Sequence, residues 1–338
     1  MVLTFAKQKS KPPYPRFYMK NKKVSWGILG TAQIAIKKVI PAMIQTKFCS
    51  IEAIASRNLS RAQSVANQFQ IKKAFGSYEA LLLDPTIEAI YIPLPNHLHV
   101  EWIIKSLEFG KNVLCEKPIA MNLSEMMTLN EKLRKYSELR VMEAFMYKFH
   151  PQWEKVKALI NIGSIGDLIH SQIHFSYAQL DPNNIRNQKK MGGGSLFDVG
   201  CYAISAARWL FTEEPVKVKG LSEYDPKMKI DRLTSGLLQF SKGSASFTCG
   251  TQMERFQVVH IFGSKGKIEI KYPFNCLDLQ ACVIVQQGSD TYQILFEPSN
   301  AYSLQVDHFS KAIRNLEPLL IPISDSINNM RVIEQLSD

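Results

Sequence analysis

Two short segments of the sequence contain side chains that could move a proton. The first is CEKP at residues 115–118, which contains Lys117, and the second is GGGSLFDVGCY at residues 192–202, which contains Asp198 and Tyr202. Hydride transfer to a carbonyl leaves an alkoxide that must gain a proton, and the reverse reaction must remove one. A phenol beside an ammonium can exchange this proton near neutral pH, because the positive charge lowers the pKa of the phenol. The two segments therefore predict an acid–base pair, Lys117 with Tyr202.

The second segment begins with three glycines and continues as a predicted helix. Glycine would let the backbone approach a cofactor or substrate closely and would let the helix begin abruptly. Asp198 and Tyr202 are four residues apart, so they share one face of a helix, and Asp198 could accept hydrogen bonds from substrate hydroxyls. The alternative is structural: Asp198 is then a carboxylate of the first helical turn and Tyr202 an aromatic residue of the core.

Lys117 follows a predicted strand at the edge where doubly wound sheets bind their ligands. Burial near a cation is expected to lower the pKa of Lys117, and Pro118 restricts its backbone. The alternative is a surface lysine that merely ends the strand.

A candidate phosphate-binding turn stands near the front of the chain. GILGTAQIA at residues 27–35 nearly meets the spacing G-x-G-x-x-G/A, with Ala32 in place of the middle glycine. A strand, turn and helix in this order direct backbone N–H groups and the positive helix end at a pyrophosphate. An ordinary tight turn gives the same pattern, but the position in the first strand–helix unit favours a dinucleotide site.

The second predicted strand ends at Ser56 and Arg57, where an NAD-binding chain needs an acidic residue for the ribose 2′-OH. A hydroxyl and a guanidinium suit a 2′-phosphate, and Glu52 lies in mid-strand, away from the ligand edge. The sequence therefore favours NADP(H) and leaves NAD(H) possible. The alternative for Arg57 is an exposed arginine in a loop.

The order of predicted elements changes at His150-Pro151. Before it, strands alternate with helical periods, which predicts a parallel, doubly wound sheet; these strands are 24–29, 51–56, 89–95, 111–118 and 139–147. After a helix at 151–161, consecutive strands predict an antiparallel or mixed sheet; these strands are 167–178, 216–224, 234–240, 244–250, 257–264, 266–272 and 290–296.

We therefore predict an α/β chain with a Rossmann domain at 23–147 and an α+β domain with an open, mostly antiparallel sheet at 148–338. The second domain would bind substrate and form oligomers. Two helical stretches at 304–316 and 326–336 end it and could pack back on the Rossmann domain.

Charge and composition limit the partners. The net charge is +11 over 338 residues, but the first 23 residues hold seven basic and no acidic side chains. Residues 1–22 are predicted to be a disordered, solvated leader, with a nucleic-acid or membrane arm as the alternative. No apolar run approaches the ~20 residues of a membrane helix, and no secretory leader is evident, so we expect a cytoplasmic protein with no membrane or nucleic-acid partner.

No metal site is expected. The six cysteines form no CxxC pair and are predicted to be reduced. His97 and His99 are two residues apart and point apart on a helix, and no Cys/His cluster completes a site. His150 begins a helix and is expected to be a residue of the domain junction rather than a catalyst.

Seven segments together, in this order, resemble the glucose–fructose oxidoreductase/inositol dehydrogenase (Gfo/Idh/MocA) family. They are GILGTAQIA, AIASR, PLPNHLH, VLCEKP, MEAFMYKFHPQ, DPNNIR and GGGSLFDVGCYAISAARWLF. The resemblance runs from about Lys23 to the C-terminus. Within the family the sequence is most similar to the branch that contains NADP-dependent xylose dehydrogenase, dimeric dihydrodiol dehydrogenase and sugar ketoreductases.

The resemblance implies roles for individual residues. It makes Lys117 the catalytic lysine, places Glu116 near the nicotinamide ribose, and brings Asn96 and His97 near the cofactor. Tyr202 stands where the inositol dehydrogenase branch has a histidine, which disfavours cyclitol oxidation. The predicted cofactor contacts are Gly27, Gly30, Thr31, Ala32, Gln33, Ile34, Ser56, Arg57, Pro95, Asn96, His99, Glu116 and Lys117. The predicted substrate contacts are Lys117, Arg186, Asp198 and Tyr202; for Arg186 a solubilising role in its loop is an equal alternative.

The resulting hypothesis is an NAD(P)-dependent oxidoreductase of a sugar, ketosugar or related cyclic polyol. The alternatives are a cofactor-sensing regulator on the same fold, and a reductase of nucleotide-linked ketosugars. Retention of both Lys117 and Tyr202 favours an enzyme, since a sensor needs neither. The resemblance also implies a homodimer or homotetramer formed through the C-terminal sheet.

Overall fold

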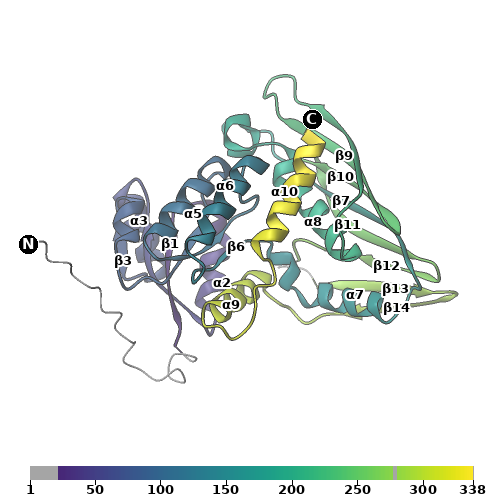
Figure 1. Ribbon diagram of the computed structural model, residues 1–338, viewed down its shortest axis with the longest axis horizontal. Helices are drawn as coiled ribbons and strands as arrows, with labels where there is room; N and C mark the ends of the chain where they lie inside the picture. The colour runs from purple at the N-terminus through teal and green to yellow at the C-terminus, as the bar shows by residue number, and fades with distance from the viewer. Residues whose placement is uncertain (1–21, 277–279, 338) are drawn as a thin grey trace, which may run out of the picture.

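The computed structural model describes residues 22–276 and 280–337, in which two sheets lie side by side (Figure 1). The first sheet has six strands in the order β3-β2-β1-β4-β5-β6, all paired in parallel. This is the strand order of a Rossmann sheet, so the predicted doubly wound fold is confirmed. Its strands are β1 (Val24–Leu29), β2 (Cys49–Ala55), β3 (Lys73–Phe75), β4 (Ala89–Ile92), β5 (Asn112–Cys115) and β6 (Val141–Glu143).

Short helices connect these strands. They are η1 (Ala35–Val39), α2 (Ile40–Ile44), α3 (Leu59–Phe69), α4 (Tyr78–Leu82), η2 (Asn96–Leu98), α5 (His99–Glu108) and α6 (Leu123–Arg134). The Asn58 side chain caps α3, because it accepts from the Arg61 N–H at 3.1 Å. The sequence analysis missed β3 and α4. The predicted basic tail at 1–22 lies, apart from Lys22, outside the described residues.

The second sheet has eight strands in the order β14-β13-β12-β11-β7-β10-β9-β8. The pair β7–β10 is parallel and the other pairs are antiparallel, so the prediction of a mostly antiparallel sheet is confirmed. The strands are β7 (Leu168–Ala178), β8 (Lys217–Tyr224), β9 (Asp231–Phe240), β10 (Gly243–Gly250), β11 (Gln252–Gly263), β12 (Gly266–Ile270), β13 (Cys282–Gln287) and β14 (Asp290–Leu295). Of these, β13 was not predicted.

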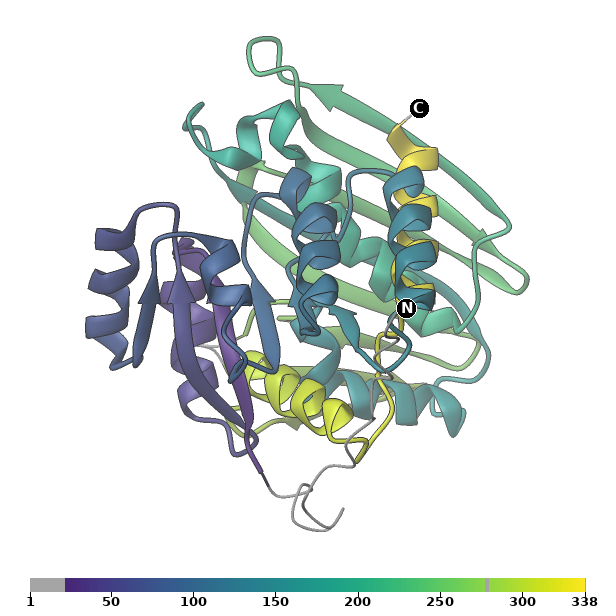
Figure 2. The same ribbon diagram turned by 60° about the vertical axis from the view of Figure 1, so that its left-hand side comes forward.

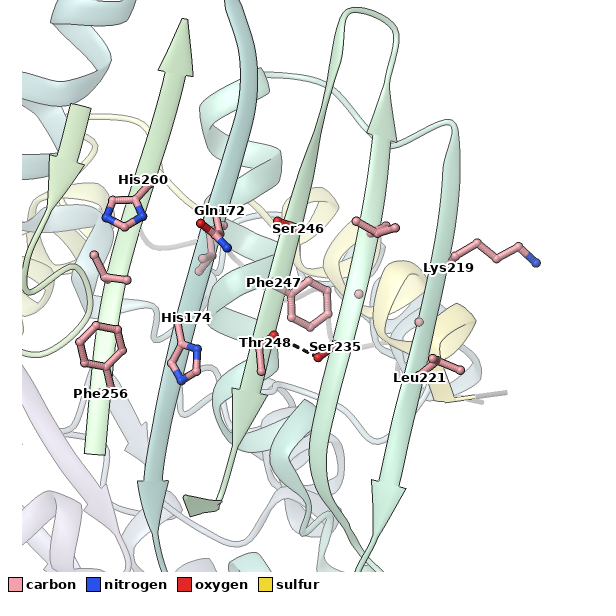
Figure 3. A pocket seen from close by; sticks show the side chains of 15 residues that line it. Gln172, His174, Lys219, Leu221, Ser235, Ser246, Phe247, Thr248, Phe256 and His260 are labelled. Carbon is pink, nitrogen blue, oxygen red and sulfur yellow. Dashed lines mark hydrogen bonds between the residues drawn. The ribbon is translucent and has the colours of Figure 1, made fainter. Parts of the chain in front are cut away.

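Helices cover one face of the second sheet (Figures 1 and 2), and no helix among the described residues covers the other face (Figure 3). The helices of this half are η3 (Met146–Phe149), α7 (Pro151–Asn161), η4 (Ile185–Asn187), η5 (Lys189–Met191), η6 (Leu196–Gly200), α8 (Cys201–Phe211), α9 (Ala301–Ile313) and α10 (Ile323–Ser337). On the covered face α10 lies close to β8, where a Cβ at Gly220 would come within 2.5 Å of Leu336.

The C-terminal helices return to the Rossmann domain. Trp26 in β1 donates its indole N–H to the Ser310 hydroxyl of α9 at 3.2 Å. Arg314, just past α9, forms two bonds of 2.8 and 2.9 Å with Glu88. Helix α10 packs against α6 on one side and β8 on the other (Figure 1). Within the described residues no helix is long and apolar enough to span a membrane.

Candidate active site

Lys117 lies where the two domains meet. Strand β5 ends at Cys115, so Lys117 follows directly at the carboxyl edge of the Rossmann sheet. Its ammonium donates to the backbone carbonyl of Asp198 at 2.6 Å and to Asp198 Oδ1 at 3.0 Å. The side chains of Lys117 and Asp198 are 12% and 15% exposed. The structure therefore joins the two segments that the sequence analysis selected for their chemistry.

Asp198 is the centre of an ion-pair network. Its Oδ2 accepts from Arg186 Nε at 3.1 Å and from the hydroxyl of Tyr177. Burial raises the pKa of Asp198, but the charges of Lys117 and Arg186 outweigh burial and hold this pKa well below its usual value. Asp198 is therefore a carboxylate over the whole physiological range. We call these four residues, Lys117, Asp198, Arg186 and Tyr177, the ionic side of the site.

The expected lowering of the Lys117 pKa is wrong. Burial lowers it and is the largest single effect, but Asp198, Cys201 and Glu116 act in the opposite direction. Together, with Asp198 the largest of the three, they raise the pKa above that of an ordinary lysine. The sequence could not supply this contact, because 81 residues separate the partners.

Tyr202 lies on the other side of Lys117, in α8. The Lys117 ammonium stands 5.1 Å from the centre of the Tyr202 ring. The Tyr202 hydroxyl contacts the Met146 sulfur at 3.5 Å. Four aromatic rings surround that of Tyr202 at centroid distances of 5.3–5.7 Å, namely Phe145, Tyr147, Phe175 and Phe274. We call Tyr202 and these four rings the aromatic side of the site.

The expected lowering of the Tyr202 pKa is also absent from this structure. Burial among the aromatic rings raises the pKa of Tyr202 well above the ordinary value for a phenol, and nearby ionisable groups, including Glu116, raise it further. The Asp198 carboxylate that pairs with Lys117 also raises the pKa of Tyr202.

The helix that carries Asp198 begins with a π-helical turn, η6, rather than an ordinary α-turn. In this turn the Cys201 N–H bonds to the Leu196 carbonyl, five residues earlier. Asp198 and Tyr202 nevertheless both reach Lys117, as their spacing predicted.

The glycine run makes room for protein atoms. A Cβ at Gly192 would lie 2.8 Å from Asn96, and one at Gly194 would lie 1.9 Å from Asp231. Gly194 also has φ +121°, a conformation that L side chains rarely adopt. Asp231 in turn accepts the Leu196 N–H at 2.6 Å. The run thus starts the helix abruptly, as predicted, and its glycines lie close to Asn96, Arg186 and Asp231.

The predicted phosphate-binding turn lies between β1 and η1. Gly30 directly follows β1 and has φ +123°, and η1 begins five residues later, at Ala35. A Cβ at Gly30 would lie 3.9 Å from the Tyr78 hydroxyl. Gly27 is interior, where a Cβ would come within 2.6 Å of Leu81, so the structure gives Gly27 a packing role that differs from its predicted cofactor contact.

Positive charge gathers beside this turn. Burial raises the pKa of Tyr78, and the charges of Arg57 and Arg61 oppose that rise, which places both guanidinium groups near the Tyr78 hydroxyl. Ser56 is buried at the end of β2, and Arg57 is exposed. A phosphate-bearing dinucleotide therefore fits this edge, with backbone N–H groups at the turn and two cations at its side.

Three further predicted cofactor residues, Asn96, Glu116 and His99, are held by contacts near the same edge. Asn96 donates its amide to the Gly192 carbonyl at 2.9 Å and so joins the two domains. Glu116 accepts from the Tyr91 hydroxyl at 2.7 Å, and burial raises the pKa of Glu116. His99 is fully buried, its ring nitrogens lie 2.8 and 2.7 Å from the Pro118 and Leu94 carbonyls, and burial lowers its pKa to about 4. His99 supports the edge from behind and offers no free nitrogen to a ligand.

Two residues of the site were missed by the sequence analysis. Tyr177 was inside a predicted strand, where alternation alone does not distinguish it from other aromatics, and Asp231 has no local motif. His150 caps α7 by accepting the Gln152 N–H at 3.2 Å, as expected for a junction residue. Within the described residues, no group of three or more His, Cys, Asp or Glu side chains could hold a metal ion.

Two family models match this chain. Residues 24–145 match the model described as oxidoreductase family, NAD-binding Rossmann fold, and residues 153–269 match the GFO/IDH/MocA C-terminal domain. An uncharacterized oxidoreductase of Rhizobium meliloti is 42% identical over 320 residues, which cover 93% of this chain and 96% of the relative.

Two further proteins resemble the chain over nearly its whole length. D-xylose 1-dehydrogenase (NADP(+)) 2 of Haloferax volcanii is 36% identical over 323 residues, covering 92% of this chain and 95% of the relative. The crystal structure of KijD10, a 3-ketoreductase from Actinomadura kijaniata in complex with NADP and TDP-benzene, superposes with a TM-score of 0.87. It is 26% identical and covers 94% of this chain and 97% of that structure.

Proposed function

The chain belongs to the GFO/IDH/MocA family of nicotinamide-dependent oxidoreductases, and on that basis we propose that it transfers hydride between NADP(H) and a sugar or ketosugar. In this proposal Lys117, Asp198 and Tyr202 form the reaction centre. The observation that carries it is the approach of Lys117, at the ligand edge of one domain, to within 3.0 Å of Asp198 Oδ1 and 5.1 Å of the Tyr202 ring centre in the other.

The preference for NADP(H) rests on the end of β2. Gly30, Thr31, Ala32, Gln33 and Ile34 would hold the pyrophosphate through backbone N–H groups, and Ser56 and Arg57 would hold the 2′-phosphate. Arg61, one helical turn further on, adds a second cation near Tyr78. The names of the Haloferax relative and of the KijD10 complex both include NADP. We expect Arg57→Ala to raise the KM for NADPH by roughly tenfold, as loss of a charge-assisted contact should, and to leave that for NADH unchanged.

In the proposed mechanism, side chains of this protein transfer one proton to or from the substrate oxygen. The nicotinamide supplies or accepts the hydride when bound. Lys117 polarises the substrate oxygen and holds it beside Tyr202, whose hydroxyl gives up or takes the proton. Asp198 keeps Lys117 protonated and oriented, because its carboxylate raises the Lys117 pKa. In this proposal Arg186 and Asp198 also bind further substrate hydroxyls.

Turnover assays test this proposal. Protein is mixed with NADPH or NADH and a panel of aldoses, ketoses and diketones, and the nicotinamide absorbance is followed. Turnover that is lost in Tyr202→Phe supports the enzyme. Tight cofactor binding without turnover on any panel member supports the cofactor-sensing regulator instead.

A nucleotide-linked ketosugar is a second candidate substrate, favoured by the TDP ligand in the KijD10 complex. In that case turnover occurs with nucleoside-diphosphate ketosugars and not with the free sugars. Cations at the domain junction, Arg186 and the exposed Lys189 and Lys190 of η5, are compatible with an anionic substrate.

We further propose that two copies of the chain pair through the open face of the second sheet. Across its central strands β9, β10, β7 and β11, neighbouring side chains form a row without lysine, arginine, aspartate or glutamate, namely Leu237, Ser246, Gln172 and His260. Figure 3 labels the last three of these residues. The apolar side chains of this face include Leu221 and Leu237, which are 84% and 58% exposed. A face depleted of charge at its centre is typical of a protein interface.

The residues beside the two ends of this row carry opposite charges, so a two-fold rotation would bring the opposite charges of two copies together. Lys219 of β8 lies beside Leu237, and Glu269 of β12 lies beside His260. A two-fold axis between β7 and β10 therefore brings Lys219 of one copy opposite Glu269 of the other. Sedimentation tests this dimer: Leu237→Glu should give monomers, while Leu83→Glu, at an exposed site on the Rossmann domain, should not. A wild-type monomer at all concentrations overturns the dimer.

A further inference from the structure

Glu143 is a buried carboxylate that the proposed reaction does not use. It is the last residue of β6, and its side chain is 3% exposed. In the parallel pairing of β5 with β6, Glu143 stands opposite Cys115. It therefore lies at the point where the chain leaves β5 to form the turn that carries Lys117.

The Glu143 side chain holds this turn directly. Its Oε1 accepts the backbone N–H of Ile119, two residues after Lys117, at 3.0 Å in a buried environment. A hydrogen bond to a carboxylate is roughly twice as strong as a neutral one. On the other side of the turn, the Pro118 carbonyl contacts a His99 nitrogen at 2.8 Å. Side chains from β6 and α5 thus hold the turn beyond the end of β5.

We propose that Glu143 is a positioning residue, whose carboxylate fixes the turn at Ile119 and thereby sets where the Lys117 ammonium lies relative to Asp198 and Tyr202. Lys117 must lie within hydrogen-bond distance of Asp198 Oδ1, now 3.0 Å, and such distances tolerate little displacement of the backbone. This inference rests on the proposed function in one respect, that Lys117 acts in turnover.

Glu143 changes charge close to neutral pH. Burial raises the pKa of Glu143 to about 7, and Asp325 of α10 raises it further, whereas the Ser326 hydroxyl, the Ile119 N–H and the Lys148 charge oppose that rise. The other ionisable neighbours are the thiols of Cys115 and Cys201. The pKa values of Lys117 and Tyr202 are raised and that of Asp198 is lowered, so none of these three moves toward neutrality.

Steady-state kinetics give the first test. Glu143→Gln keeps the size and an acceptor oxygen but removes the charge, and we expect kcat to fall roughly tenfold with KM for the cofactor unchanged. The wild-type kcat should decline as pH falls through 7, and this decline should be missing in Glu143→Gln. The matched control is Glu125→Gln, because Glu125 accepts the Met121 N–H at 2.9 Å in the same loop. Wild-type kcat and pH profile in a folded Glu143→Gln protein overturn the proposal.

A second measurement does not need turnover. In protein labelled with 15N-isoleucine, with the Ile119 amide assigned by Ile119→Val, the amide shift should titrate near pH 7 in the wild type and not in Glu143→Gln. The rate at which an acylating reagent modifies Lys117, followed by mass spectrometry, should change in Glu143→Gln and not in Glu125→Gln. If the Ile119 amide titrates and the Lys117 acylation rate changes as expected while no substrate is turned over, the proposed function fails and the positioning role stands. An Ile119 amide that does not titrate, or an unchanged Lys117 rate, overturns the positioning role.

Discussion

The ionic and aromatic sides of the candidate site hold their side chains in different ways. On the ionic side, Asp198 binds Lys117 and Arg186 at 3.0 and 3.1 Å and also accepts from Tyr177. On the aromatic side, Tyr202 is held by ring packing, and its hydroxyl contacts the thioether of Met146, which is a weak acceptor. Ion pairs and hydrogen bonds therefore hold the ionic side, and packing of aromatic rings holds the aromatic side.

This difference gives the ionic side and the aromatic side different roles in the proposed reaction. Strong contacts fix the charge states of Lys117 and Asp198, which the reaction does not need to change. The weak contact leaves the Tyr202 hydroxyl free to exchange Met146 for a substrate oxygen at little cost, since a bond to sulfur is easily replaced. The group proposed to carry the proton is thus the one with the weakest polar partner.

Removing Lys117 should have the largest effect. In Lys117→Ala, Asp198 keeps Arg186 and Tyr177, so we expect the protein to fold while kcat falls by roughly 10³-fold. The measurement is kcat beside thermal unfolding. Lys105→Ala is the control, because Lys105 pairs with Glu101 on the surface of α5 and should be silent. Equal activity in both variants would remove the ionic side from the reaction.

Tyr202→Phe should come next, with a fall in kcat of roughly 10²-fold. Because the polar partner of the lost hydroxyl among the described residues is a thioether sulfur at 3.5 Å, the free energy of unfolding should change by less than about 1 kcal/mol. Urea unfolding and turnover, measured on the same preparation, check both statements. A large loss of stability with unchanged turnover would make Tyr202 a core residue, the structural alternative.

Asp198→Asn should shift the pH dependence as well as the rate. Without the carboxylate, burial and the Arg186 charge are opposed by the weaker effects of Cys201 and Glu116, so the Lys117 pKa should fall. Loss of one close opposite charge is worth roughly one to three pH units. The alkaline limb of the kcat profile should therefore move to lower pH, with kcat reduced about tenfold. An alkaline limb that stays in place would show that Asp198 does not control Lys117.

Tyr177→Phe should have the smallest effect of the four. Asp198 loses one hydrogen-bond donor but keeps Lys117 and Arg186, which carry the charge. We expect kcat to fall only a few-fold, as for loss of one hydrogen bond worth about 1 kcal/mol, with a larger rise in KM for substrate. Comparison of kcat with KM checks this. An effect as large as that of Tyr202→Phe would mean that the proton leaves through Tyr177.

The parts of the site that were predictable are those with local signals. The glycine run, the CEKP segment and the end of β2 each combine a rare residue pattern with a position at a strand end, and the structure brings the first two together through Lys117 and Asp198. The charge states were not predictable in this way. Whether Lys117 gains or loses proton affinity depends on the balance between burial and Asp198, and that balance requires coordinates.

In the fold, too, elements with a local sequence pattern were predictable and elements without one were not. Long, strongly patterned strands such as β7 and β11 were predicted, whereas β3 has three residues and offers no periodicity. Gly27 was assigned to the ligand because its sequence position fits a nucleotide motif, but packing against Leu81 explains it. Tyr177 and Glu143 were missed because each acts on a residue that is close in space and distant or unmarked in sequence.

The return of α9 to β1 has a consequence for how the chain is made. Trp26 and its partner Ser310 are 284 residues apart, so the first strand leaves the ribosome long before the helix that covers it exists. Until then the nascent nucleotide-binding half exposes apolar surface, and such surface is prone to aggregation during synthesis. This half cannot be completed before α9 has been synthesised, and a chain stopped short of α9 should depend on chaperones.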